Sequence, residues 1–311
     1  MNVAEFLQWL RASGDEGSIA HVERIPSRPA VYGEWPAGLD SRILDLLARR
    51  GISRPYSHQA AAIAQIREGR NVVVVTPTAS GKTLCYNVPV VDTMLRDPRA
   101  RALYLFPTKA LAQDQLAELH SLIEDLGADI RTFTYDGDTP ANARKSVRLA
   151  GNIVVTNPDM LHTGILPHHT KWHRLFSELR YIVVDEMHTY RGLFGSHVAN
   201  VLRRLRRICE HYGSHPQIIL CSATIANPRE LAERLVEEPV ELIAESGAPI
   251  AGKWLVLYNP PVVNRQLGIR ASSLLTARHI ASKLIGGGTH TIVFAAEKAR
   301  REGRIVKLAE M

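Results

Sequence analysis

Short runs of apolar residues alternate along the chain with longer stretches in which apolar residues recur every three or four positions. The short runs predict β-strands. Several are continuously apolar, such as Val72-Val73-Val74-Val75, as in strands covered on both faces. We expect strands at residues 71–75, 102–106, 131–135, 152–155, 181–184, 217–221, 240–243, 254–258 and 291–295. Strand–helix alternation of this kind predicts an α/β fold with a mostly parallel sheet and helices on both faces.

Two of the intervening helices have a clear apolar face. One is expected over residues 109–126 and ends at Gly127. The other is expected over residues 197–212, where four arginines lie mostly off the apolar stripe: Arg203, Arg204, Arg206 and Arg207. We interpret these arginines as a solvated polar face, with a nucleic-acid patch as the alternative.

Prolines and other residues that interrupt helices and strands divide the chain into three segments. Residues 1–50 are expected to form an accessory N-terminal segment interrupted by prolines, and residues 51–250 the main α/β domain. Residues 251–311, in which Pro260-Pro261 marks a seam, are expected to hold a linker and the beginning of a further domain.

Composition narrows the class of protein only slightly. Hydrophobic residues make up 45% and charged residues 22%, and no run of about 18 apolar residues or signal-peptide pattern is present, so we expect a cytoplasmic protein without a membrane partner. The net charge of +7 suits a polyanion such as nucleic acid. The three cysteines are far apart, which favours buried thiols over a zinc site or disulfides.

A phosphate-binding loop follows the first of the apolar runs. Thr76-Pro77-Thr78-Ala79-Ser80-Gly81-Lys82-Thr83 stands between a predicted strand and a predicted helix, the context that a P-loop requires. Backbone N–H groups of Thr78, Ala79, Ser80 and Gly81 would surround the phosphates of ATP, Lys82 would contact the β- and γ-phosphates, and the Thr83 hydroxyl would hold Mg²⁺. Thr76 replaces the usual first glycine, and an ordinary strand-to-helix turn is the alternative.

A second chemical feature ends the strand at residues 181–184, where Asp185 and Glu186 follow four apolar residues. Adjacent carboxylates at a buried strand end repel each other, and a divalent cation removes that cost. We assign Asp185 to Mg²⁺ and Glu186 to the general base that orients or deprotonates water, with a solvated acidic turn as the alternative.

At this point the sequence resembles the superfamily 2 DEAD/DEAH-box helicases. The family's motifs occur in order as Tyr56-Ser57-His58-Gln59, the P-loop, Phe106-Pro107-Thr108-Lys109-Ala110-Leu111, Thr156-Asn157-Pro158-Asp159, Asp185-Glu186-Met187-His188, Ser222-Ala223-Thr224 and Ile292-Val293-Phe294. The resemblance implies a RecA-like P-loop NTPase domain over residues 51–250, the start of a truncated second RecA-like domain after residue 250, and ATP hydrolysis coupled to translocation on nucleic acid.

The resemblance also implies roles for individual residues. Gln59 would read adenine, and Thr108, Lys109 and Thr156 would contact the nucleic-acid strand. Ser222 and Thr224 would couple the nucleotide site to that strand through hydroxyl bonds with His188. The residues alone leave an alternative for each role. Gln59 could be a surface polar residue, and Thr108 and Thr156 could be helix caps. Residues 222–224 could form a turn of small residues.

A narrower resemblance is to the YprA/mitomycin-repair-factor-A helicases. It is carried by the P-loop continued through Leu84-Cys85-Tyr86, by Tyr135-Asp136-Gly137-Asp138-Thr139, by the segment from Tyr190 to His197, and by Leu267-Gly268-Ile269-Arg270. This group implies DNA as the substrate, 3′-to-5′ unwinding and a role in DNA repair; RNA remains the alternative substrate.

The second lobe of such a motor is the main element that we do not find. No Gln-x-x-Gly-Arg-x-Gly-Arg-like arginine-finger motif or cysteine-rich module occurs, and we expect a second lobe in cis in longer relatives. The isolated chain is therefore expected to bind ATP–Mg²⁺ weakly and hydrolyse little. The alternatives are a non-catalytic fragment that binds ATP and nucleic acid, and a small-molecule P-loop kinase.

Overall fold

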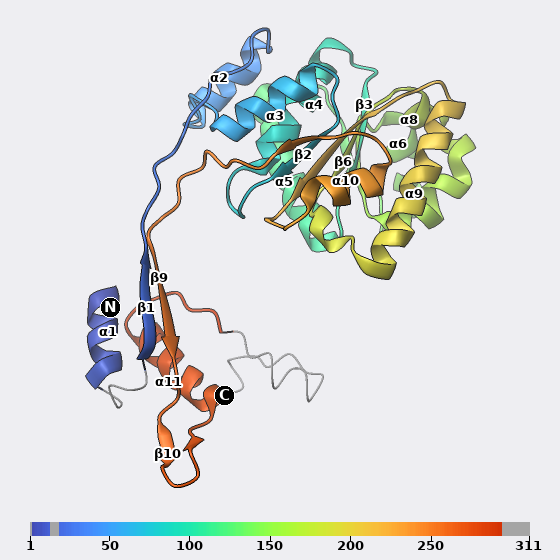
Figure 1. Cartoon of the computed structure of the whole chain (residues 1–311). Helices are drawn as coiled ribbons and strands as arrows, with labels where there is room; N and C mark the ends of the chain where they lie inside the picture. Colours follow the sequence, from blue (N-terminus) through green and yellow to red (C-terminus); the bar gives the residue numbers. More distant parts are fainter. Residues whose placement is uncertain (1, 13–18, 294–311) are drawn as a thin grey trace. The chain divides into compact units, whose positions relative to one another are not determined.

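The computed structural model describes residues 2–12 and 19–293, and they form two compact units (Figure 1). One unit is Pro29–Pro249, and the other combines Met1–Arg28 with Ile250–Met311. The last expected strand, at residues 291–295, extends beyond the described residues, and residues 291–293 are not in a strand. Within the described part of the chain, no helix combines the length and apolar character needed to cross a bilayer.

The unit Pro29–Pro249 is built on a seven-stranded sheet with the order β4-β5-β3-β6-β7-β2-β8, in which every neighbouring pair is parallel. The strands are β2 (Val72–Val75), β3 (Arg101–Leu105), β4 (Thr132–Thr134), β5 (Ile153–Thr156), β6 (Leu179–Val184), β7 (Gln217–Ser222) and β8 (Glu241–Ile243). The expected parallel α/β fold is confirmed.

Helices cover both faces of this sheet (Figure 1). They are α2 (Ser41–Arg49), α3 (Ser57–Arg67), α4 (Lys82–Arg96), α5 (Lys109–Leu126), α6 (Ala141–Ala150), α7 (Pro158–Met160), α8 (His173–Ser177), α9 (Gly192–His211) and α10 (Pro228–Val236). Short π- and 3₁₀-helical turns occupy Leu161–Ile165, Leu166–Trp172 and Met187–Thr189.

Each face of the sheet has its own hydrophobic core, because successive strand residues point to opposite sides. In β2, Val72 and Val74 pack with residues of α2 to α5, whereas Val73 and Val75 pack with residues of α6, α8, α9 and α10. Helix α2 lies within the expected accessory segment, yet its Ile43, Leu46 and Leu47 belong to the first of these cores. The strands are therefore buried on both sides, as their continuous apolar runs indicate.

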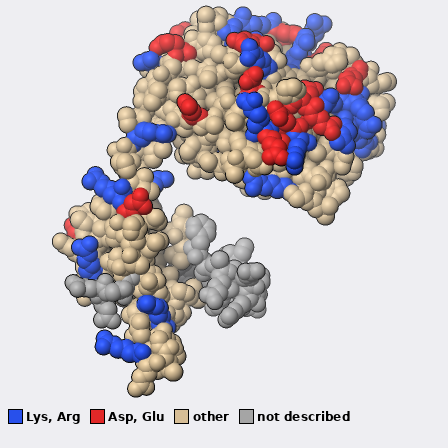
Figure 2. All heavy atoms as spheres, viewed as in Figure 1, with Lys and Arg blue, Asp and Glu red and all other residues tan. Residues whose placement is uncertain are grey.

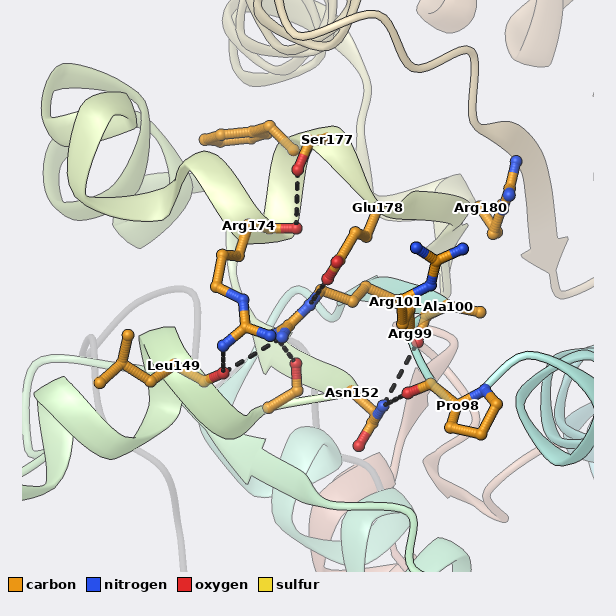
Figure 3. A network of polar contacts seen from close by, with 12 residues as sticks. Pro98, Arg99, Ala100, Arg101, Leu149, Asn152, Arg174, Ser177, Glu178 and Arg180 are labelled. Atoms are coloured by element: carbon orange, nitrogen blue, oxygen red, sulfur yellow. Dashed lines mark hydrogen bonds and ion pairs between the residues drawn. The ribbon is translucent and has the colours of Figure 1, made fainter.

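A cluster of polar contacts around Arg101 holds the amino-terminal edge of the sheet (Figure 3). The Arg101 guanidinium, at the start of β3, pairs with Glu178 at 2.9 Å and donates to the carbonyl oxygens of Gly151 and Leu149. Arg174 donates to the same Leu149 carbonyl at 3.2 Å. Because the Arg101 side chain is only 5% exposed, its charge depends on these partners.

The unit formed by the two ends of the chain is smaller. Strand β1 (Ile19–Ile25) pairs antiparallel with β9 (Lys253–Tyr258), and β10 (Val262–Asn264) pairs with β11 (Ile269–Arg270). Helices α1 (Val3–Ala12) and α11 (Ser273–Gly286) meet through the rings of Trp9 and His279, whose centroids lie 5.6 Å apart.

Candidate nucleotide site

A cavity of about 600 Å³ lies at the carboxyl edge of the sheet, where β2 and β6 end. In parallel α/β sheets this is the edge at which ligands bind. The cavity brings together the whole expected nucleotide-binding set and both acidic residues: Gln59, Thr78, Ala79, Ser80, Gly81, Lys82, Thr83, Asp185 and Glu186. It is also lined by residues that sequence reasoning did not select, among them Tyr32, Arg50, Arg54, Tyr56 and Gln115.

The phosphate loop is held by its own side chains. The buried Thr76 hydroxyl lies 2.6 Å from the Ser80 hydroxyl, and Lys82 Nζ donates to the carbonyls of Thr76 and Pro77 at 3.0 Å each. Threonine at the place of the usual first glycine therefore closes the loop with a side-chain bond. Ala79 has a left-handed backbone with φ 60°, which is uncommon outside glycine and costs about 1 kcal/mol.

Gly81 begins α4 with φ 75°, a region that suits glycine. A Cβ atom at this position would lie 2.6 Å from Nε2 of Gln59. The Gln59 side chain itself is almost fully buried; its Oε1 accepts from the Tyr56 N–H at 2.8 Å and its Nε2 donates to the Gly81 carbonyl at 2.9 Å. Gln59 thus ties α3 to the phosphate loop and keeps one amide N–H for a ligand.

His58 also connects α3 to the phosphate loop through its ring nitrogens. Its Nδ1 accepts from the Gly247 N–H at 3.2 Å, and its Nε2 lies 3.1 Å from the Ser80 carbonyl oxygen. Both bonds form with a neutral ring that carries its proton on Nε2. Burial lowers the pKa of His58, which favours the same neutral form.

The two acidic residues differ in their surroundings. Asp185 is 8% exposed, accepts from the Glu186 N–H at 2.7 Å, and has its pKa raised by burial. Glu186, two residues after the end of β6, has a left-handed backbone with φ 49°. Oε2 of Glu186 is buried without a hydrogen-bond partner and lies 3.1 Å from Nδ1 of His188. This contact becomes an ion pair when His188 is protonated.

A chain of hydrogen bonds connects the two expected Mg²⁺ ligands. The Thr83 hydroxyl donates to Oε1 of Gln115 at 3.1 Å, and the Tyr86 hydroxyl lies 3.2 Å from both Gln115 Oε1 and Asp185 Oδ2. Burial holds the pKa of Tyr86 well above its usual range, so this hydroxyl keeps its proton. Sequence reasoning missed Gln115, although its signal is visible: it is a polar residue between Ala112 and Leu119 on the buried face of α5.

The expected coupling residues meet in a different way. His188 Nδ1 lies 3.3 Å from the backbone N–H of Ala223, whereas the Ser222 hydroxyl donates to the Ala223 carbonyl at 2.7 Å. The expected hydroxyl bonds from Ser222 and Thr224 to His188 are therefore replaced by one backbone contact. A contact to a backbone N–H does not depend on the type of residue, so the sequence does not predict it.

The expected strand-contacting residues lie at or after the ends of the neighbouring strands β3 and β5. Thr108 caps α5 by accepting from the Leu111 N–H, and Lys109 pairs with the exposed Asp138. The Thr156 hydroxyl is buried and donates to the Tyr135 carbonyl at 2.6 Å. The structure therefore leaves Thr108 and Lys109 near the surface and gives Thr156 an internal partner.

Charged side chains of both signs are intermixed on the visible face of Pro29–Pro249 (Figure 2). On α9, Arg203 pairs with Glu237 through Nε at 2.9 Å, and Arg206 pairs with Glu238 at 3.3 Å. These pairs agree with the interpretation of the arginine cluster as a polar helix face. Cys85, Cys209 and Cys221 are buried free thiols, as expected.

The parallel sheet, the phosphate loop after β2 and the paired acidic residues define a RecA-like P-loop nucleotide-binding domain. Residues 56–232, more than half of the chain, match the DEAD/DEAH box helicase family. The chain belongs to this family, and the resemblance inferred from its motifs is confirmed.

Two relatives and one solved structure align with nearly the whole length of this chain. An uncharacterized ATP-dependent helicase YprA of Bacillus subtilis (strain 168) is 53% identical over 92% of this chain, and the ATP-dependent helicase HRQ1 of Saccharomyces cerevisiae is 39% identical over 89% of it. A crystal structure of the DUF1998 helicase MrfA bound to DNA and AMPPNP superimposes with a TM-score of 0.91 at 50% identity and covers 96% of this chain.

The share of each relative that this chain covers is much smaller. This chain spans 38% of YprA, 26% of HRQ1 and 41% of the MrfA chain. It therefore corresponds to only part of each of these relatives.

Proposed function

We propose that this chain is the nucleotide-binding lobe of an ATP-dependent DNA helicase that moves 3′-to-5′ and serves DNA repair. The observation that carries this proposal is the single cavity that contains Gln59, the phosphate loop, Asp185 and Glu186. Its relatives support the choice of DNA, since MrfA was crystallised with DNA and AMPPNP. The site thus has the parts for ATP binding and for activation of water.

In this proposal each side chain of the site has one task. Lys82, held at the loop by two carbonyls, contacts the β- and γ-phosphates. Glu186, whose Oε2 has no hydrogen-bond partner, accepts the proton of the attacking water. Gln59 presents its remaining amide N–H to adenine. Thr108 and Lys109 contact the DNA backbone at the first turn of α5.

The residues of the site also fit Mg²⁺. A hydroxyl and a carboxylate are hard oxygen ligands, and the buried Asp185 carboxylate is a charge that a cation would offset. Thr83 and Asp185 would hold the ion, which would neutralise charge on the phosphates.

We propose that residues 251–311 are the linker and the first part of a second RecA-like lobe, which a longer protein would complete. An arginine finger from such a lobe raises phosphoryl-transfer rates by about 10³-fold or more. The 311-residue chain alone should therefore bind nucleotide and hydrolyse it slowly. Robust DNA-stimulated turnover by the purified chain would contradict this part of the proposal.

Nucleotide binding tests the proposal directly. A fluorescent ATP analogue should bind the chain, and Lys82→Ala should weaken binding by about 10- to 100-fold, because a hydrogen bond to a charged group contributes about 1.5–3 kcal/mol. Lys145→Ala, an exposed lysine of α6, is the matched control and should leave the affinity unchanged. Equal affinities of the two variants would refute the phosphate role of Lys82.

The substrate is tested by competition between single-stranded DNA and RNA of the same sequence at one fixed salt concentration. We expect DNA to bind more tightly and to increase nucleotide affinity. Preference for RNA would make the protein an RNA helicase lobe instead. Indifference of the nucleotide site to either nucleic acid would favour a small-molecule kinase.

A further inference from the structure

The two proposed Mg²⁺ ligands are joined by side chains that have no assigned task. Asp185 and Thr83 come from β6 and α4, and Tyr86 and Gln115 connect them in the order Asp185–Tyr86–Gln115–Thr83. The last of these, Gln115, belongs to a third element, α5. An amide on the buried face of α5 therefore reaches into the nucleotide cavity, which it lines.

Gln115 Oε1 is within hydrogen-bond distance of two hydroxyls. An amide oxygen has two lone pairs, and Gln115 Oε1 receives the Thr83 hydroxyl at 3.1 Å and the Tyr86 hydroxyl at 3.2 Å. Tyr86 has a single hydroxyl proton for two acceptors, Gln115 and Asp185. Removing the amide would leave Thr83 without this acceptor and Tyr86 with Asp185 alone.

The direction of the Thr83 proton matters for a cation. A hydroxyl binds a metal ion through an oxygen lone pair, so its proton has to point away from the ion. The Gln115 oxygen draws that proton toward α5 and leaves the lone pairs of Thr83 for the ion. Groups that hold a metal ligand in this way commonly affect metal affinity by about 10- to 100-fold.

We propose that Gln115 is a positioning residue for Mg²⁺: its Oε1 fixes the hydroxyl of Thr83 in the orientation that binds the ion. This inference rests on the proposed function, because it assumes a nucleotide–Mg²⁺ site between Thr83 and Asp185. It adds a residue of α5 to that site. Gln115 would act through the Thr83 hydroxyl and not as a ligand of the ion.

The test separates Mg²⁺ affinity from nucleotide affinity in the complete 311-residue chain. A fluorescent ATP analogue is titrated in EDTA and then at increasing free Mg²⁺, which gives a nucleotide affinity and a Mg²⁺ midpoint. Gln115→Leu should raise the Mg²⁺ midpoint about 10-fold or more and leave nucleotide affinity in EDTA unchanged. Gln115→Glu keeps an acceptor oxygen and should have a midpoint at or below that of the wild type.

Gln113→Leu is the matched control, because Gln113 is an exposed residue of the same helix outside the cavity; its midpoint should equal that of the wild type. The inference is overturned by an unchanged midpoint in Gln115→Leu, by a Gln115→Glu midpoint as high as that of Gln115→Leu, or by equal loss of nucleotide binding in EDTA and Mg²⁺. Absence of nucleotide binding by the wild type would instead refute the proposed function.

Discussion

At the scale of single residues, the site depends on a few unusual backbone conformations. Glu186 and Ala79 both have positive φ without being glycine. Such conformations cost about 1 kcal/mol or more and persist where surrounding contacts hold them. The carboxylate of Glu186 contacts Nδ1 of His188 at 3.1 Å. In the proposed function, this conformation would help to separate the metal ligand Asp185 from the base Glu186.

A first prediction follows for Glu186. In a longer protein that carries both lobes, Glu186→Gln should keep nucleotide affinity and lower the ATP hydrolysis rate by at least about 100-fold, because the amide cannot accept the proton of water. Glu210→Gln, at an exposed position near the end of α9, is the control. The assignment of Glu186 as the base fails if hydrolysis by the Gln variant stays near the wild-type rate.

A second residue-scale prediction concerns pH and His58. Its folded-state pKa is lowered from 6.5, so the unfolded chain binds more protons as the pH falls. The stabilisation by neutral His58 is complete above about pH 6.5 and is lost as the pH falls toward the folded pKa. Thermal unfolding midpoints at pH 7.5 and 5.5 should show a larger acid-induced decrease for the wild type than for His58→Gln.

The exposed His215 supplies the control for this measurement, since His215→Gln should keep the pH dependence of the wild type. If His58→Gln has the same pH dependence as His215→Gln, the tie between α3 and the phosphate loop does not depend on the protonation state of His58.

At the scale of elements, the sheet has different chemistry at its two edges. The carboxyl edge carries the cavity, and the amino-terminal edge carries the buried Arg101 cluster (Figure 3). Helix α5 connects two features of the carboxyl edge, because Thr108 caps its start and Gln115 lies further along its buried face. The Arg101 cluster and the candidate nucleotide cavity therefore lie at opposite edges of the sheet.

We predict that Arg101→Met lowers the free energy of unfolding by about 2–3 kcal/mol, because Glu178 loses its partner and two backbone carbonyls lose a donor. Arg99→Met, at a neighbouring exposed arginine, should change it by less than about 0.5 kcal/mol. Urea unfolding measures both, and nucleotide affinity should be unchanged in either variant. A stability of Arg101→Met equal to that of Arg99→Met would contradict a structural role for the cluster.

The sequence predicts the elements of the sheet well because β2 is apolar throughout, β3 and β6 each carry one arginine near their start, and the three strands are almost entirely buried. It does not predict β1, whose partner β9 lies more than two hundred residues away and whose side chains are mostly exposed. The same reason applies to the site. Lys82 and Asp185 are recognised by local motifs, whereas the contacts of Gln115 and Ala223 depend on elements that meet only in the fold.

At the scale of the whole molecule, the chain forms a unit from its two ends and a unit from its middle. The middle unit contains the complete candidate nucleotide cavity and both hydrophobic cores. Its first and last residues lie close together, because the N–H of Val31 donates to the Gly247 carbonyl at 2.8 Å.

We predict that residues 29–249 fold as an independent domain. The fragment should unfold in a single cooperative transition and bind the ATP analogue within about 3-fold of the affinity of the whole chain, because its cores and cavity are self-contained. Calorimetry and fluorescence titration measure these properties. An unfolded fragment, or one that binds nucleotide more than about 10-fold more weakly, would show that the terminal unit supports the site.

The pairing of the chain ends also has a mechanical consequence. Arg28 and Ile250 exchange two backbone hydrogen bonds of 2.9 Å and form an isolated antiparallel bridge in the same register as the β1–β9 pair. Force that separates Ile19 from Tyr258 would therefore open these pairs one after another and would reach the Arg28–Ile250 bridge last.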